Sequence, residues 1–168
     1  MLKKISKGYS KLSDFLELIN KNVTIGFLVI LILIVFFQVA SRIFTGKSFV
    51  QIEELSIVLA AWLGFFALAY SAKRGVHVRI DVFSNMLPKT AQKILTLVVN
   101  VATFAASVYL VIYGWQLAMR KMNVPLMVLP FPSGVQYLAF PVGMAFTSLF
   151  LIDHILKSIV ALTEKEEK

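Results

Sequence analysis

Charged side chains that could pair at a membrane boundary stand at the ends of long apolar runs in this sequence. Glu53 and Glu54 come directly before the uncharged run 55–72, and Arg42 lies late in the apolar run that precedes them. A partly desolvated ion pair between Arg42 and one of these glutamates would hold two antiparallel helices together. Two alternatives stay open: a glutamate pairs with another subunit, or Arg42 snorkels to the interface and the charges are simply exposed.

A second group of polar residues follows the run 55–72. Its members are Lys73, Arg74, His77, Arg79 and Asp81. One histidine and one aspartate are too few ligands for a metal ion, so a solvated loop is the favoured interpretation. Near the C-terminus, Asp153 and Lys157 are four residues apart, a spacing at which helical side chains pair.

The remaining residues carry no recognisable catalytic, substrate-binding or metal-binding pattern. The chain has no cysteine and two histidines, which excludes thiolate chemistry and is too few for a haem bundle or a di-metal enzyme. A carrier normally keeps ionisable groups at mid-membrane, whereas here Asn100 is the clearest polar residue of its apolar run. We therefore expect no cofactor and no enzymatic activity.

Composition indicates an all-α integral membrane protein with one membrane domain, 1–168. The chain is 58% hydrophobic with a mean hydropathy of +0.80, well above a soluble domain. Eighteen uncharged residues in 55–72 rise about 27 Å as a helix, close to the thickness of bilayer hydrocarbon. The predicted elements are an amphipathic interfacial helix at 1–21 and membrane spans at 22–44, 53–72, 94–119 and 134–162.

The segment 1–21 has a basic face and an apolar face at helical spacing, which is typical of a helix lying in the membrane interface. Its lysines would contact anionic lipid headgroups. The alternative is the basic start of a signal peptide, which we disfavour because the following apolar run is too long and no cleavage site follows.

Small residues predict where helices pack closely. Ala60, Gly64, Ala67 and Ser71 form one stripe, and Ala139, Gly143 and Thr147 form another. Trp62 lies away from the first stripe and is interpreted as a packing residue. Pro141 removes one backbone hydrogen bond and should bend the last span near Tyr137.

The segment 120–133 is apolar, yet Pro125, Pro130 and Pro132 interrupt it. It is too short and too broken to span a membrane. An apolar loop needs cover, either from lipid or from a partner protein.

Lysine and arginine residues are distributed unevenly between alternate sides of the four spans. Thirteen lie in the N-terminal segment, the connection 73–93 and the C-terminal end, and four lie on the opposite side. This asymmetry predicts that both termini are cytoplasmic. It also explains the net charge of +8 without nucleic acid, because the bases flank apolar spans.

Taken together, these motifs resemble the small, DctQ-like membrane subunit of tripartite ATP-independent periplasmic (TRAP) transporters. The similar residues are Glu53, Glu54, Trp62, the run Arg74-Gly75-x-His77-x-x-x-Asp81, and the segment from Pro130-Phe131-Pro132 to Pro141-Val142-Gly143. The overall pattern most resembles the sialic-acid branch of that family.

The resemblance implies a non-catalytic scaffold subunit in the bacterial inner membrane. Its partners would be a large multi-span elevator-type subunit, which carries the substrate and sodium sites, a periplasmic substrate-binding protein that delivers an organic acid, and membrane lipid. The structural or partner-contact residues would be Arg42, Glu53, Glu54, Trp62, Arg74, His77, Asp81, Pro132, Pro141 and Gly143. A stand-alone four-helix carrier or channel, and a small membrane enzyme or haem protein, are the competing interpretations.

Overall fold

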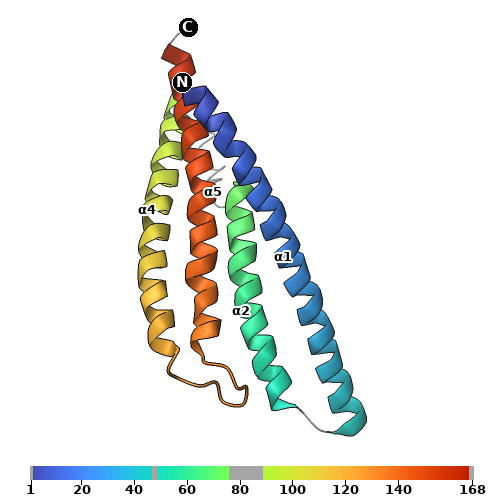
Figure 1. Ribbon diagram of the computed structural model, residues 1–168. Helices are drawn as coiled ribbons and strands as arrows, with labels where there is room; N and C mark the ends of the chain where they lie inside the picture. The colour runs from blue at the N-terminus through green and yellow to red at the C-terminus, as the bar shows by residue number, and fades with distance from the viewer. Residues whose placement is uncertain (1, 47–48, 76–88, 167–168) are drawn as a thin grey trace.

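The protein folds into long helices that run side by side (Figure 1). The computed structural model describes residues 2–46, 49–75 and 89–166. The helices are α1 (Leu2–Thr45), α2 (Val50–Lys73), α4 (Lys89–Lys121) and α5 (Gly134–Glu166). All four contain a stretch long and apolar enough to cross a membrane, so the predicted all-α class with four candidate spans is confirmed.

The helices form a row rather than a closed bundle. α5 packs against α4, α2 and α1, and α2 also packs against α1. Figure 1 shows α4 and α1 on the outside of the row and both chain termini at the same end. Many large apolar side chains of α1, such as Phe36 and Phe44, are exposed, so the outer face of the row needs lipid or another protein to cover it.

α1 is one continuous helix, and the segment 1–21 does not form a separate element as predicted. Nothing at the expected junction stops a helix, since neither proline nor glycine lies between Asp14 and Thr24. Ser6, Ser13 and Asn20, spaced seven residues apart, are buried. The first half of α1 therefore turns a polar stripe toward the protein and leaves apolar side chains exposed.

The predicted small-residue stripe of α5 is buried against α2. Ala139, Gly143 and Thr147 are all buried. A Cβ atom added at Gly143 would lie 2.6 Å from the Cβ of Phe65 and 2.8 Å from its carbonyl oxygen, which no side chain could tolerate without moving α2. Glycine at this position lets the two backbones approach closely.

The stripe predicted on α2 lies differently. Ala60 and Gly64 are exposed, and no atom of the described chain lies within 4 Å of a Cβ atom added at Gly64. The buried side of α2 carries Phe66, Ala69 and Ala72 instead. This close-packing surface is therefore not used within the described part of the chain.

Aromatic rings fill the space between α1, α2 and α5. The contacts connect Phe27 with Trp62 and Phe66, and continue from Phe66 through Phe146 to Phe150. Ring centroids lie 5.6–6.4 Å apart, in the range of favourable aromatic pairs. The centre of this part of the row is thus a packed apolar column.

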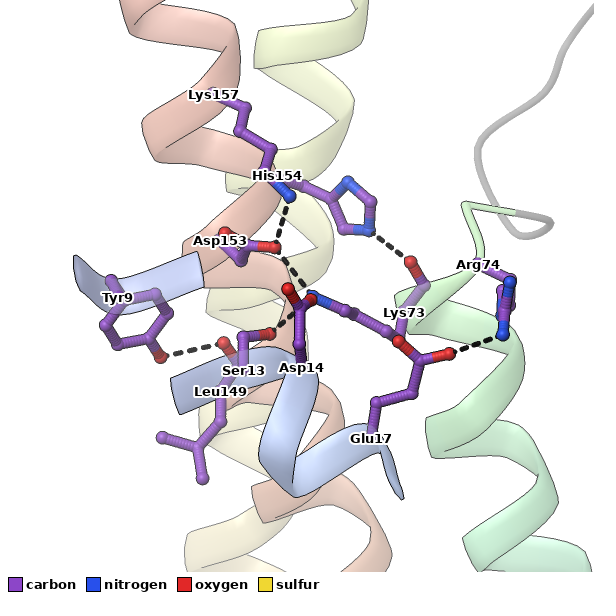
Figure 2. Close-up of polar contacts among 10 residues, drawn as sticks. All are labelled: Tyr9, Ser13, Asp14, Glu17, Lys73, Arg74, Leu149, Asp153, His154 and Lys157. Carbon is purple, nitrogen blue, oxygen red and sulfur yellow. Dashed lines mark hydrogen bonds and ion pairs between the residues drawn. The ribbon is translucent and has the colours of Figure 1, made fainter. Parts of the chain in front are cut away.

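α2 ends at Lys73, and the glycine that follows, Gly75, turns the chain away from the helix axis. Gly75 has φ +71°, a conformation that side chains other than glycine rarely adopt, and its N–H donates to the carbonyl of Ala72. Lys73 and Arg74 therefore lie at the same end of the row as the N-terminal part of α1 and the C-terminal part of α5 (Figure 2).

Candidate functional site

The ammonium group of Lys73 is the centre of a polar cluster that joins three helices (Figure 2). Its Nζ lies 2.8 Å from Ser13 Oγ, 2.9 Å from Asp14 Oδ1 and 2.8 Å from Asp153 Oδ2. An ammonium group has three N–H donors, and each has an acceptor here. The Lys73 side chain is almost fully buried, so α2 is tied to both α1 and α5 at this point.

Asp153 of α5 is the most enclosed acid of the cluster. Its side chain is 0% exposed, and its Oδ2 accepts hydrogen bonds from both Lys73 and Lys157, the latter at 2.7 Å. Its second oxygen, Oδ1, is buried without a hydrogen-bond partner among the residues described. The predicted pair of Asp153 with Lys157 is confirmed. The more consequential partner is Lys73, which comes from another helix.

Further contacts surround this centre. Arg74 forms an ion pair with Glu17 at 2.8 Å, and its guanidinium lies over the ring of Tyr70. The hydroxyl of Tyr9 donates to the carbonyl of Leu149 at 2.8 Å. These contacts again join α1 to α2 and α5.

His154 adds a link between α5 and the end of α2. Its Nε2 lies 2.9 Å from the carbonyl oxygen of Lys73. A carbonyl can only accept a hydrogen bond, so Nε2 carries the proton. We refer to Ser13, Asp14, Glu17, Lys73, Arg74, Asp153, His154 and Lys157 as the Lys73 cluster.

The arrangement suits a structural role better than a chemical one. Three basic and three acidic side chains balance in charge: Lys73, Arg74 and Lys157 against Asp14, Glu17 and Asp153. The two charges of the cluster that are removed from water, Lys73 and Asp153, are paired and hydrogen-bonded, as buried charges must be to be stable. Within residues 6–46, 49–75 and 91–160, no group of three or more metal-ligating side chains comes together.

At the opposite end of the row, Glu54 binds the connection between α4 and α5. Its carboxylate accepts hydrogen bonds from three consecutive backbone N–H groups, those of Met127, Val128 and Leu129, at 2.6–2.9 Å. The connection is also closed on itself by two backbone hydrogen bonds, Leu126 N to Phe131 O and Ser133 N to Val124 O. Glu54 therefore holds the turn of this loop against the start of α2.

The loop 122–133 is ordered but apolar on its outside. Met127 is 97% exposed, and Val124, Val128 and Phe131 are also exposed. We call these four residues the apolar loop tip. Its need for cover by lipid or a partner, expected from the sequence, is consistent with this exposure.

The predicted pair of Arg42 with Glu53 or Glu54 stays a prediction. The contacts of Glu54 that the structure describes are with backbone amides of the loop between α4 and α5. Arg42 and Glu53 are both exposed.

Other predicted residues are packing residues. Trp62 donates its indole N–H to the carbonyl of Val135 at 3.2 Å, across from α2 to α5. The carbonyl of Pro132 accepts a hydrogen bond from Val135 N at the start of α5. Pro141 is fully buried, and Gly143 lies against Phe65. His77 and Asp81 lie outside the described residues.

Sequence reasoning missed the α1 side of the Lys73 cluster. Asp14 and Glu17 lie three residues apart in a segment interpreted from its lysines and its apolar residues, without its acids. Ser6, Ser13 and Asn20 repeat every seven residues, a spacing that places them on one face of a helix. That repeat was the available signal, and the Asn20 side chain indeed donates to the carbonyl of Phe66 on α2.

Fold and site together define a multi-pass helical membrane protein whose charged residues connect helices at their ends. Residues 31–161 match the family described as tripartite ATP-independent periplasmic transporters, DctQ component. The chain belongs to this family and is a small permease subunit of the bacterial inner membrane.

Several relatives from this family are similar along much of the chain. The sialic acid TRAP transporter small permease protein SiaQ of Vibrio cholerae is 26% identical over 148 residues, 86% of each chain. The ectoine TRAP transporter small permease protein TeaB of Halomonas elongata is 25% identical over 77% of this chain and 66% of its own. The C4-dicarboxylate TRAP transporter small permease protein DctQ of Rhodobacter capsulatus is 33% identical over 58% of this chain and 44% of its own.

Proposed function

We propose that this chain is a fixed scaffold that packs against a large, elevator-type transport subunit. The observation that carries the proposal is the placement of charge. Charged side chains of α2, α4 and α5 lie toward the ends of these helices, and those of α1 lie at or before Lys21 except for Arg42. The Lys73 cluster and Glu54 use several of them to hold helices and a loop. The middle of the row is filled by aromatic packing instead. A subunit that coupled ions itself would keep ionisable groups at bilayer depth.

The exposed outer faces support a partner of large size. The row leaves one side of α1 and the Ala60–Gly64 part of α2 exposed. Small residues at helix interfaces allow close backbone approach in membranes. We propose that the large subunit covers the exposed stripe of α2, and that lipid covers the rest.

Orientation follows from the distribution of basic residues. We propose that the end with both termini and the Lys73 cluster is cytoplasmic, and that the lysines of residues 1–21 contact anionic headgroups there. The apolar loop tip then lies on the periplasmic side, where it faces the large subunit or the substrate-binding protein.

For the transported solute, we propose an organic acid, with sialic acid as the first candidate and sodium as the coupling ion. Support comes from the resemblance of the motifs and from the relative SiaQ, which aligns along 86% of the chain. Other relatives carry the names of C4-dicarboxylate and ectoine transporters. No residue of this chain is assigned a contact with solute.

Purification and reconstitution test the scaffold role. The full chain, extracted under mild conditions from its native membrane, should co-purify with a much larger membrane protein identified by mass spectrometry. Liposomes that contain only this chain should take up no sialic acid under a sodium gradient, whereas the complex with its binding protein should. Uptake by the chain alone would contradict the proposal and favour a stand-alone carrier.

A substitution on the exposed stripe tests the docking surface separately. Gly64→Leu adds a bulky side chain where no atom of the described chain is in contact. The isolated protein should keep its melting temperature, whereas co-purification of the large subunit should fall. Gly26→Leu on α1, also without a neighbour within 4 Å, is the matched control. Equal loss in both variants would contradict docking at the α2 stripe.

A further inference from the structure

The loop between α4 and α5 pairs its backbone donors while it exposes apolar side chains. Three of the ten residues 124–133 are prolines, which have no N–H group. Six of the other seven N–H groups donate to acceptors within the described chain: those of Val124, Leu126, Met127, Val128, Leu129 and Ser133. A loop surrounded by water needs no such arrangement, because water accepts hydrogen bonds from its N–H groups.

Glu54 supplies the acceptors at the turn of this loop. One carboxylate oxygen accepts from the N–H of Met127, and the other accepts from those of Val128 and Leu129. The loop therefore offers few unpaired N–H groups to its surroundings. A segment in a medium without acceptors, such as lipid hydrocarbon, must have its backbone donors paired in this way.

The side chains around this paired backbone are apolar. Residues 122–133 contain no charged side chain, and Asn123 and Ser133 are their only polar ones. Within the apolar loop tip, Met127 is 97% exposed, and the other three side chains are 40–55% exposed. An exposed apolar group of this kind marks a contact with lipid or with protein.

The length of α2 places the loop at one boundary of the bilayer hydrocarbon. Glu54 and Lys73 are nineteen residues apart on this helix, with no charged residue between them. Nineteen residues rise about 28 Å at 1.5 Å per residue, against roughly 30 Å of hydrocarbon. With these two charged residues at opposite boundaries, the loop that Glu54 holds lies where the acyl chains meet the headgroups.

Other residues at this end of the row are typical of a membrane interface. Figure 1 shows the loop at the same end as the end of α1 and the start of α2. Ile43 and Phe44, near the end of α1, are 73% and 87% exposed. Trp115 is exposed within two turns of the end of α4, and Arg120 and Lys121 follow in the last turn. Tryptophan is enriched at membrane interfaces, and basic side chains reach phosphate headgroups from there.

We propose that the apolar loop tip inserts into lipid at this end of the row, and that Glu54 enables the insertion by pairing the backbone of the turn. A protein partner could accept hydrogen bonds from a loop, whereas lipid hydrocarbon cannot, and this turn needs no outside acceptor. Partner subunits on this side would then contact residues other than the four of the tip. The inference concerns the chain by itself and does not rest on the scaffold role.

Single cysteines can report the surroundings of the tip, since the chain has no cysteine of its own. Met127→Cys, labelled with the fluorophore NBD in lipid nanodiscs, should be quenched strongly by phospholipid that carries a spin label near the start of its acyl chain, and weakly by aqueous iodide. Ile112→Cys, exposed in the apolar part of α4, is the control for lipid. Asn123→Cys, exposed at the polar base of the loop, is the control for water. Iodide quenching at position 127 as strong as at position 123 would overturn the insertion.

The assembled complex tests whether lipid or a protein covers the tip. Labelled Met127→Cys should be quenched by the spin-labelled phospholipid as strongly in nanodiscs of the complex as in nanodiscs of the isolated chain. Loss of this quenching in the complex alone would show that a protein covers the tip, and would overturn the proposal. Failure to obtain a complex would count against the scaffold role and leave the measurement on the isolated chain intact.

The part played by Glu54 has its own pair of variants. Glu54→Ala, combined with labelled Met127→Cys, leaves three N–H groups without acceptors, which is costly in lipid but not in water. Quenching by the spin-labelled phospholipid should therefore fall several-fold, and quenching by iodide should rise. Glu53→Ala, exposed and one residue earlier, is the matched control and should change neither.

Glu54→Gln replaces Glu54→Ala if the latter does not fold, as judged by circular dichroism. Its neutral oxygen is a weaker acceptor, so the change should be smaller and in the same direction. Unchanged quenching by lipid in whichever of the two variants folds would overturn the role assigned to Glu54.

Discussion

At one end of the row, Lys73 holds three helices through side chains that come from α1, α2 and α5. At the other end, Glu54 holds a single loop through three backbone N–H groups. Both contacts use one charged residue of α2 and three partners. They differ in what the partners are. At the first end they are charged and polar side chains, of which Ser13 and Asp153 are buried, and at the second end they are main-chain amides of a surface loop.

This difference predicts whether the loss of one residue destabilises the whole protein or only the segment around it. Lys73 lies beside Asp153, an acid with no exposure, so its removal leaves a buried charge with fewer partners. Glu54 forms no ion pair with a residue that the structure describes, and its loss returns three amides to water at the surface. The Lys73 end should therefore respond globally and the Glu54 end locally.

The largest effect is expected for Lys73→Met. Breaking a buried ion pair by removal of one partner typically costs about 3–5 kcal/mol, and Asp153 would keep only the half-exposed Lys157 as a partner. The free energy of unfolding, measured in a detergent titration, should fall by about this amount. The double variant Lys73→Met with Asp153→Leu should recover much of the loss. A loss in the single variant no larger than that of Glu54→Gln would remove the contrast between the two ends.

A smaller loss is expected for Gly143→Ala, between the two ends. The added Cβ would meet Phe65 at 2.6 Å, and overpacking of this kind costs about 1–3 kcal/mol. The measurement is the same detergent titration. Gly64→Ala adds the same methyl group to open space and should cost nothing in the isolated chain. If both variants were equally stable, close approach of α2 and α5 would not contribute to holding the row together.

Glu54→Gln should leave the unfolding transition unchanged and loosen only the loop. A neutral amide oxygen is a weaker acceptor than a carboxylate, so the N–H groups of Met127, Val128 and Leu129 should exchange with solvent several-fold faster. Hydrogen exchange with mass spectrometry measures this directly. Glu53→Gln, one residue earlier and exposed, should exchange as the unmodified chain does. A fall in global stability would show that the loop contact is as far-reaching as the Lys73 cluster.

The smallest effect is expected for Lys157→Ala. Lys157 is half exposed, and Asp153 keeps Lys73 as a buried partner. Exposed ion pairs contribute about 1 kcal/mol or less, so the melting temperature should hardly change. A loss as large as that of Lys73→Met would mean that Asp153 depends on both lysines equally.

The helices could be predicted from the sequence because the pattern that indicates a membrane-spanning helix is local. Long apolar runs and their charged flanks predicted four helices that could span a membrane, and the motifs around Glu54, Trp62 and Pro141 resembled the family that the chain belongs to. The pair of Asp153 with Lys157 was also within reach, since it depends only on spacing along one helix. The pairing of Arg42 with a glutamate stays a prediction. The partner of Glu54 could not be predicted from the sequence, because it is a loop more than seventy residues away.

By itself, the sequence determined that the chain is helical and apolar, with its charges mainly outside the apolar runs, because hydropathy and periodicity can be read within one or two helical turns. Only the tertiary structure decided that Ser13 and Asp14 of α1 and Asp153 of α5 meet at Lys73, and that Gly143 rather than Gly64 lies at a helix contact within the chain. Those choices depend on how each helix is rotated about its axis, and that rotation is set by packing against neighbours far away in the sequence.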